Sequence, residues 1–177
     1  KRQLEDCLGR IWQCGTIQVD FSMPERLGAT YIGEDGYRHT PVMLHRAILG
    51  SFERFIGILI ENYAGDFPFW LAPEQIRLLP VTDDVQPYAE QLLDKLKAAG
   101  VSATIDRSGE RLGKIIRTGE QMKIPVLAVI GAKEAQQNAV SLRSRRDGDL
   151  GVHSVDVLLQ AAQLANTERQ PGLGLNS

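Results

Sequence analysis

The chain has 177 residues, of which 43% are hydrophobic and 24% charged, a profile that excludes a disordered protein and indicates one sizeable domain or two small ones. The formal net charge of −2 argues against non-specific coating of nucleic acid but permits a local basic face. The longest apolar stretch, residues 55–60, is too short to span a bilayer, and no signal peptide is recognisable.

The first third of the chain predicts strands. Residues 12–21 (WQCGTIQVDF) alternate from Thr16 onward and predict a strand with one polar face, on which Thr16 and Gln18 lie together. A strand end and turn are expected at 31–36, and a second strand over 40–46. Because there is no initiator Met and the start is already strand-like, we expect a fragment whose N-terminal part is missing.

Apolar residues recur at helical spacing from position 52, which predicts a helix that ends near Asn62. The segment 63–73, rich in aromatic residues, Gly and Pro, breaks this helix and predicts a domain boundary. We therefore expect three parts: an incomplete first domain at 1–72, a second domain at 73–167 and a disordered tail at 168–177.

The second domain alternates strands with helices, which predicts a compact α/β fold with right-handed crossovers. Its fully apolar run VLAVI is typical of a strand in a buried parallel sheet. The expected strands are 75–81, 101–105, 126–130 and 140–145, and the expected helices are 87–100, a short one within 108–123, and 155–166.

The polar residues in PVMLHRAILGSFERF allow two interpretations each. A lone His45 on a strand is more often a hydrogen-bonded core residue than a zinc ligand, and no standard zinc spacing is present. Gly50 and Ser51 stand at a strand-to-helix junction that favours anions. Arg54 suits a phosphate or a flat base, or equally an ion pair with Glu53 or Glu61 on a solvated helix.

Two further groups also leave alternatives open. Thr16 and Gln18 suit a small polar substrate above a sheet, or simply the solvent face of an antiparallel sheet. Cys14 is expected to be a packed, reduced thiol in a cytosolic protein, as is Cys7. In the second domain, two basic clusters favour a polyanion over ordinary surface charge: Arg107, Arg111, Lys114, Arg117 and Lys123, then Arg143, Arg145 and Arg146.

The stretches WQCGTIQVDF, YIGEDG and HRAILGSFERF together resemble the threonyl-tRNA synthetase family, class II, over roughly residues 6–165. HRAILGSFERF is similar to the third signature motif of class II synthetases. The resemblance implies the fold class: the end of an antiparallel-sheet catalytic domain, then a compact mixed-sheet α/β anticodon-binding domain. It also implies a cytoplasmic homodimer without a membrane partner that joins threonine to threonine tRNA with ATP and Mg²⁺.

The resemblance also implies site residues. His45 matches the third ligand of a zinc ion that binds threonine, the other ligands lying outside this chain. Arg54 matches the arginine against adenine and the ATP phosphates, and Gln13, Thr16 and Ser51 match the lining of the ATP site. Gln18 matches a catalytic-site residue beside threonine and the tRNA end, and Cys14 matches a wall of that pocket.

In the second domain, the resemblance implies anticodon contacts from Arg117, Lys123, Glu134 and Arg143. Lys123 stands where the family often has arginine. The replacement keeps the positive charge but cannot form the two parallel hydrogen bonds of a guanidinium group. Gly109 stands where a polar side chain is common. Two functions therefore compete: part of a threonine–tRNA ligase that is inactive as this chain alone, or a truncated, non-catalytic module that binds RNA.

Overall fold

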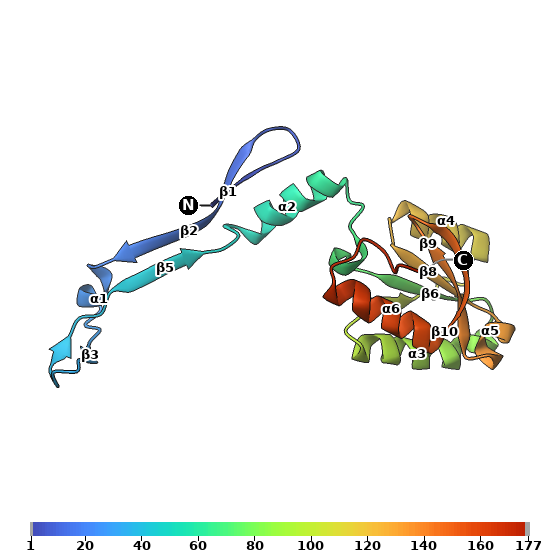
Figure 1. The fold of residues 1–177 in the computed structure, drawn as a ribbon. Coiled ribbons are helices and arrows are strands. Elements are labelled where there is room, and N and C mark those ends of the chain that lie inside the picture. The colour runs from blue at the N-terminus through green and yellow to red at the C-terminus, as the bar shows by residue number, and fades with distance from the viewer. Residues whose placement is uncertain (1, 176–177) are drawn as a thin grey trace. The chain divides into compact units, whose positions relative to one another are not determined.

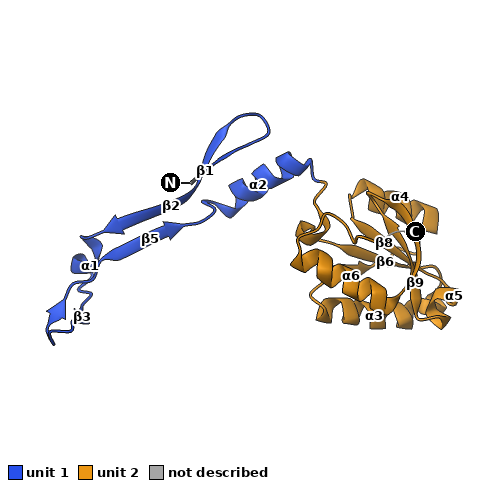
Figure 2. Cartoon of the chain, viewed as in Figure 1, with its two compact units in different colours: residues 1–65 blue, residues 66–177 orange. Residues whose placement is uncertain are grey.

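The computed structural model describes residues 2–175 and divides the chain into two compact units, residues 1–65 and residues 66–177 (Figures 1 and 2). Each unit has its own sheet and its own buried residues. Within the described residues, the structure contains no helix that is both long and apolar enough to cross a membrane.

Unit 1 is built on a three-stranded antiparallel sheet in the order β1-β2-β5. The strands are β1 (Arg2–Glu5), β2 (Ile11–Asp20) and β5 (Met43–Ala47), with the pair β3 (Tyr31–Ile32) and β4 (Arg38–His39) inserted between β2 and β5. The helices are α1 (Met23–Arg26) and α2 (Phe52–Tyr63). The strands predicted at 12–21 and 40–46 and the helix predicted from residue 52 are confirmed as β2, β5 and α2.

Unit 2 has a mixed five-stranded sheet in the order β10-β9-β8-β6-β7. Strand β6 (Ile76–Pro80) runs parallel to β7 (Ala103–Ile105) and β8 (Val126–Ile130), and β9 (Ala139–Ser144) is antiparallel to both β8 and β10 (Gly148–Ser154). The helices are α3 (Gln86–Ala98), α4 (Leu112–Gln121), α5 (Ala132–Gln136) and α6 (Val155–Thr167), with short 3₁₀ turns η1 (Phe69–Leu71) and η2 (Asp83–Val85). The predicted mixed-sheet α/β class is confirmed.

The surroundings of strand β8 explain why its sequence is apolar throughout. Val126 and Ala128 join the larger core cluster, to which α3 and α6 contribute. Leu127 belongs to a second cluster, to which α4 contributes Ile115. Since successive side chains of a strand point to opposite faces, β8 is covered on both faces and every position is apolar.

The unit boundary lies before the position expected from sequence. The aromatic and Pro-rich segment was expected to contain the boundary, with the first domain ending at residue 72. The structure divides the chain within that segment, so that its residues from Asp66 onward belong to unit 2. Phe69 is fully buried in the core of unit 2, and its amide donates to the Pro171 carbonyl at 3.0 Å. Burial of this one aromatic side chain therefore assigns the segment to the second unit.

The expected disordered tail, 168–177, differs from the structure at Leu173, and its last two residues lie outside the described part of the chain. Leu173 is buried in the core of unit 2, although its surroundings in sequence are rich in Gly, Pro and polar residues. Strand β10 and helix α5 were not predicted at all. Gly148 and Gly151 interrupt the alternation of β10, and both have positive φ angles, +81° and +78°, with an irregularity in the strand register between them.

Candidate functional site

The polar face of strands β2 and β5 brings two predicted pocket residues together. Gln18 lies opposite His45 in the antiparallel register, so both side chains occupy the same face. They line an open hollow of about 760 Å³ together with Val19, Asp20, Phe21 and Ser22. His45 is 46% exposed at its side chain, which excludes the core histidine considered from sequence.

Asp20 fixes the imidazole of His45. The Asp20 carboxylate lies 3.0 Å from His45 Nε2 and also accepts from the amides of Ser22 and Met23 at 2.9 and 3.0 Å. The Met23 amide, then the His45 side chain and the Ser22 amide, hold the pKa of Asp20 well below its usual range. The carboxylate is therefore ionised at neutral pH and orients the histidine.

The described residues 2–175 contain no group of three or more His, Cys, Asp or Glu side chains that could hold a metal ion. His45 and Asp20 supply one imidazole and one carboxylate, whereas a catalytic zinc site needs three protein ligands. The donors present in this chain therefore do not fit a zinc centre without further ligands.

The start of α2 lies against strand β2. Gly50 has φ +75°, and a Cβ there would lie 3.6 Å from the carbonyl oxygens of Gln13 and Cys14. Ser51 is the N-cap of α2, and its hydroxyl accepts from the Arg54 amide at 3.3 Å. The glycine thus supplies the positive φ of the turn that leads into α2, and this turn lies beside the backbone of Gln13, so two of the predicted ATP-site segments meet.

Arg54 does not form the ion pair considered from sequence. Its guanidinium carbon lies 5.8 Å from the ring centre of Trp12, a cation–π geometry. Glu53 instead accepts from the Ser51 hydroxyl at 2.7 Å, a bond that lowers the pKa of Glu53. Glu61 pairs with Arg10. Arg54 therefore keeps its charge available next to an aromatic ring.

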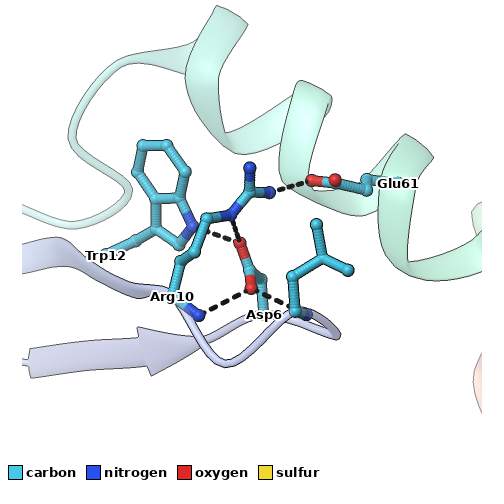
Figure 3. A network of polar contacts seen from close by, with 5 residues as sticks. Asp6, Arg10, Trp12 and Glu61 are labelled. Atoms are coloured by element: carbon cyan, nitrogen blue, oxygen red, sulfur yellow. Dashed lines mark hydrogen bonds and ion pairs between the residues drawn. The ribbon is translucent and has the colours of Figure 1, made fainter.

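Sequence reasoning assigned no role to Trp12, Asp6 or Arg10. Asp6 is nearly inaccessible, and its carboxylate accepts from Trp12 Nε1 at 2.7 Å and from Arg10 Nε at 2.5 Å (Figure 3). Burial alone would raise the pKa of Asp6, but hydrogen bonds from Trp12, Arg10 and the Leu8 amide hold it far below its usual range. The turn between β1 and β2 brings Asp6, Arg10 and Trp12 together, and only the contact of Arg10 with Glu61 is distant in sequence.

The remaining predicted residues of unit 1 differ in accessibility. Cys14 is buried, as expected of a packed thiol, while Thr16 is half-buried and Gln13 is exposed. Side-chain alternation places Cys14, Thr16 and Gln18 on one face of β2 and Gln13 on the other, so Gln13 and Gln18 are accessible and the Cys14 thiol is not.

In unit 2, the structure brings Arg143 of β9 next to α4. Arg143 Nε lies 3.5 Å from Glu120 Oε1, and both side chains are about half exposed. Arg117 is exposed on the same helix as Glu120, and among the described residues it has no ion pair. The strand and the helix thus present two of the predicted anticodon-reading arginines.

Glu134, Lys123 and Gly109 lie in three different local settings. Glu134 accepts from the Gly131 amide at 3.0 Å and so caps the start of α5. Lys123 follows α4 with φ +60°, a backbone region that L-residues rarely adopt, and it is itself engaged in a contact. Gly109 has φ +69° in the loop before α4, and a Cβ built there would meet no other atom of the described chain within 4 Å.

The predicted basic face is partly neutralised. Carboxylates pair with four of its cations, at 2.6 to 3.5 Å: Arg107 with Glu90, Lys114 with Glu110, Arg143 with Glu120 and Arg145 with Asp66. Arg111, Arg117 and Arg146 have no ion pair among the described residues. The free positive charge of this face is therefore smaller than the sequence count indicates.

Two protein families match separate parts of the chain. The family described as "Anticodon binding domain" matches residues 75–163. The family described as "tRNA synthetase class II core domain (G, H, P, S and T)" matches residues 3–63. The two matched ranges lie within unit 2 and unit 1, respectively.

Curated relatives are similar across nearly the whole chain. The threonine–tRNA ligase of Synechococcus sp. (strain CC9902) is 76% identical over 98% of the chain. That of Thermosynechococcus vestitus is 57% identical over 88% of the chain. The chain spans only 28% and 26% of the length of these two relatives.

A solved structure supports the same fold. The RNA binding domain of threonyl-tRNA synthetase from Cryptosporidium parvum aligns with a TM-score of 0.75 and 34% identity, over 90% of this chain and 41% of that one. Prolyl-tRNA synthetase from the same organism aligns with a TM-score of 0.58 and 19% identity over 90% of this chain and 36% of that one, a likeness of fold alone.

Proposed function

The chain belongs to the anticodon binding domain family, and from that premise we propose that it forms part of a threonine–tRNA ligase. In such an enzyme, unit 1 would supply part of the site where threonine and ATP react, and unit 2 would read the tRNA. The observation that carries the proposal is the 76% identity to a threonine–tRNA ligase over 98% of the chain.

For unit 1, the proposed chemistry needs charge stabilisation rather than a protein nucleophile. The carboxylate of threonine would attack the α-phosphorus of ATP, which forms threonyl-adenylate and releases pyrophosphate. Arg54, which has no carboxylate partner among residues 2–175, suits the phosphates of ATP with Mg²⁺. Ser51, Gln13 and Thr16 would line the same site, and Gln18 and Cys14 would flank threonine.

His45 is proposed as a zinc ligand only within a longer protein that contributes further ligands. It is accessible and oriented by Asp20, an arrangement that suits a metal-binding imidazole. A neutral imidazole would add one ligand to the ion, and no step of the reaction is assigned to the metal here. The homodimer and the cytoplasmic location are proposed on resemblance alone.

For unit 2, we infer that Arg117 and Arg143 contact bases of the anticodon loop and that Glu134 and Lys123 contribute to the same surface. Unstacked RNA bases are recognised by hydrogen bonds and by stacking on planar groups such as guanidinium. The 3.5 Å contact between Arg143 and Glu120 is long for an ion pair and is exposed, so an RNA base can displace it at small cost.

Binding of the 177-residue chain to threonine tRNA, and to the same tRNA with an exchanged anticodon, tests the proposal. Arg143→Ala should weaken binding to the cognate tRNA by about 1–3 kcal/mol and reduce discrimination between the two RNAs. Arg107→Ala is the matched control, because Arg107 is also an exposed, paired arginine of this unit. Equal losses for both RNAs in Arg143→Ala would remove it from base recognition.

A non-catalytic RNA-binding module is the second candidate, favoured by the separate core of unit 2. Threonine-dependent exchange between ATP and pyrophosphate separates the two. We expect no exchange by the 177-residue chain alone. We expect exchange when the chain replaces the matching 28% of the Synechococcus sp. (strain CC9902) ligase. Loss of exchange in that chimera would favour the module.

A further inference from the structure

Trp12 lies beside two arginines that come from different elements. The guanidinium carbon of Arg10 is 5.5 Å from the centre of the Trp12 ring, and that of Arg54 is 5.8 Å from it. Arg10 precedes β2, whereas Arg54 lies in the first turn of α2. The indole ring therefore links the β1–β2 hairpin to the start of the helix.

The ring itself is held by a buried anchor. The Asp6 side chain is only 1% exposed, and its carboxylate accepts from Trp12 Nε1 at 2.7 Å. The same carboxylate accepts from Arg10 Nε and from the amides of Leu8 and Arg10 (Figure 3). Rotation of the indole would leave a buried carboxylate with one donor fewer, which is costly. The orientation of Trp12 is therefore fixed from the hairpin side.

A second contact ties the other end of α2 to the same hairpin. Glu61 pairs with Arg10, whose guanidinium also contacts Asp6 (Figure 3). Arg54 and Glu61 are seven residues apart, so they lie on the same side of the helix, with buried Ile58 between them. Two attachments on one side leave the helix little freedom to rotate about its axis.

We propose that Trp12, anchored by Asp6, is a positioning residue that fixes the guanidinium of Arg54 where it meets ATP. The proposal rests on the role proposed above for Arg54. An arginine side chain has several rotatable bonds, and an aromatic face that restrains it reduces the entropy lost when a phosphate or a base is bound. Trp12 acts through Arg54 and needs no contact with the substrate.

The first test reads the geometry directly in the 177-residue chain, without activity. Ring currents of Trp12 should displace the NMR resonance of the Arg54 Nε–H group. Trp12→Leu should move that resonance toward its value in an unstructured peptide, and Trp12→Phe should retain part of the displacement. The matched control is Trp70→Leu, because Trp70 also lies 5.7 Å from an arginine, Arg169, but belongs to unit 2. An Arg54 resonance unchanged by Trp12→Leu would overturn the proposal.

The second test measures ATP–pyrophosphate exchange in the chimeric ligase described above. Trp12→Leu should raise the KM for ATP about two- to fivefold, the range of an exposed cation–π contact, and leave the KM for threonine unchanged. Trp12→Phe should restore most of the affinity. In an Arg54→Ala background, Trp12→Leu should have no further effect, since its action passes through that arginine.

Additive effects of the two substitutions, or an equal rise in both KM values, would assign Trp12 a merely structural role. Absence of exchange in the unsubstituted chimera would instead count against the proposed function. In that event the Arg54 resonance still decides the positioning role, so the two failures are distinguishable.

Discussion

The two units stabilise themselves in different ways. Unit 2 encloses a continuous apolar core, in which Leu78, Leu142 and Leu158 are fully buried. Unit 1 leaves large apolar side chains of its sheet more than half exposed, among them Ile17, Val19 and Leu44. Its buried features are few, and the best connected is the polar cluster around Asp6.

This difference has a physical consequence for each unit. Apolar burial provides most of the free energy of folding, so unit 2 has its own driving force and should unfold cooperatively. Unit 1 buries few apolar side chains, Cys14 and Ile58 among them, so it has less of this driving force, and its Asp6 cluster adds a contribution that depends on pH. Substitutions that remove buried groups should therefore have the largest effect in unit 2.

The sharpest test of the comparison is Leu142→Ala in β9. Leu142 is fully buried in the larger core, and its truncation should lower the free energy of unfolding of unit 2 by about 2–5 kcal/mol. Val152→Ala in the neighbouring strand is the control, because Val152 is more than half exposed. Denaturant unfolding followed by circular dichroism measures both. Similar losses in the two variants would contradict a self-contained core.

A smaller loss of unfolding free energy is expected from Gln75→Ala, which removes a buried polar side chain of unit 2. Gln75 Nε2 donates to the Phe69 carbonyl at 2.8 Å and to Asn166 Oδ1 at 2.6 Å, and its Oε1 accepts from the Ser102 amide. Loss of these partners should cost about 1–3 kcal/mol.

Gln160→Ala, at an exposed position of α6, is the control for this substitution and should change the same unfolding curve little. An unaltered midpoint for Gln75→Ala would show that water replaces the lost bonds. In that case the Gln75 contacts would not contribute to the independence of unit 2.

The smallest change in stability is expected in unit 1, when acid protonates Asp6. Because the pKa of Asp6 is lower in the folded chain than its ordinary value, the stability it contributes is complete above about pH 4. That contribution should decrease as the pH falls from about 4 toward the folded-state pKa. The indole N–H resonance of Trp12, followed by NMR during acidification, measures this change.

Two controls apply to the acid titration. The indole resonance of Trp70 reports on unit 2 and should not follow the same transition. Asp6→Asn should abolish the acid-dependent change at Trp12, because the amide does not titrate. A transition that persists in Asp6→Asn would assign the change to another group and remove Asp6 as the anchor.

Much of the fold could be predicted because local patterns coincide with the final environment. Each of three patterns matches one kind of element: alternation matches strand β2, helical spacing matches α2, and the apolar run matches the buried strand β8. Strand β10 was missed because two glycines interrupt its pattern. The order of the buried tail was missed because Leu173 is a single apolar residue among Gly and Pro.

The candidate site could be proposed from the sequence only where a motif carries it. His45, Ser51 and Arg54 stand in one recognisable stretch, and pairing of β2 with β5 brings Gln18 to the first of them. The contacts of Trp12 with Asp6 and Arg54 depend on a hairpin and a helix packing together, which spacing does not reveal. The pairing of Arg145 with Asp66 joins residues 79 apart in sequence.

The paired cations of unit 2 determine how RNA binding should respond to ionic strength. When a free arginine meets a phosphate, a counterion is released from the RNA, and affinity falls as salt rises. A paired cation such as Lys114 must first leave Glu110, and the freed carboxylate then attracts a cation from solution. The slope of affinity against salt concentration would therefore count fewer contacts than the RNA makes, and among cations with no proposed base contact it would report mainly Arg111 and Arg146, which have no ion pair among the described residues.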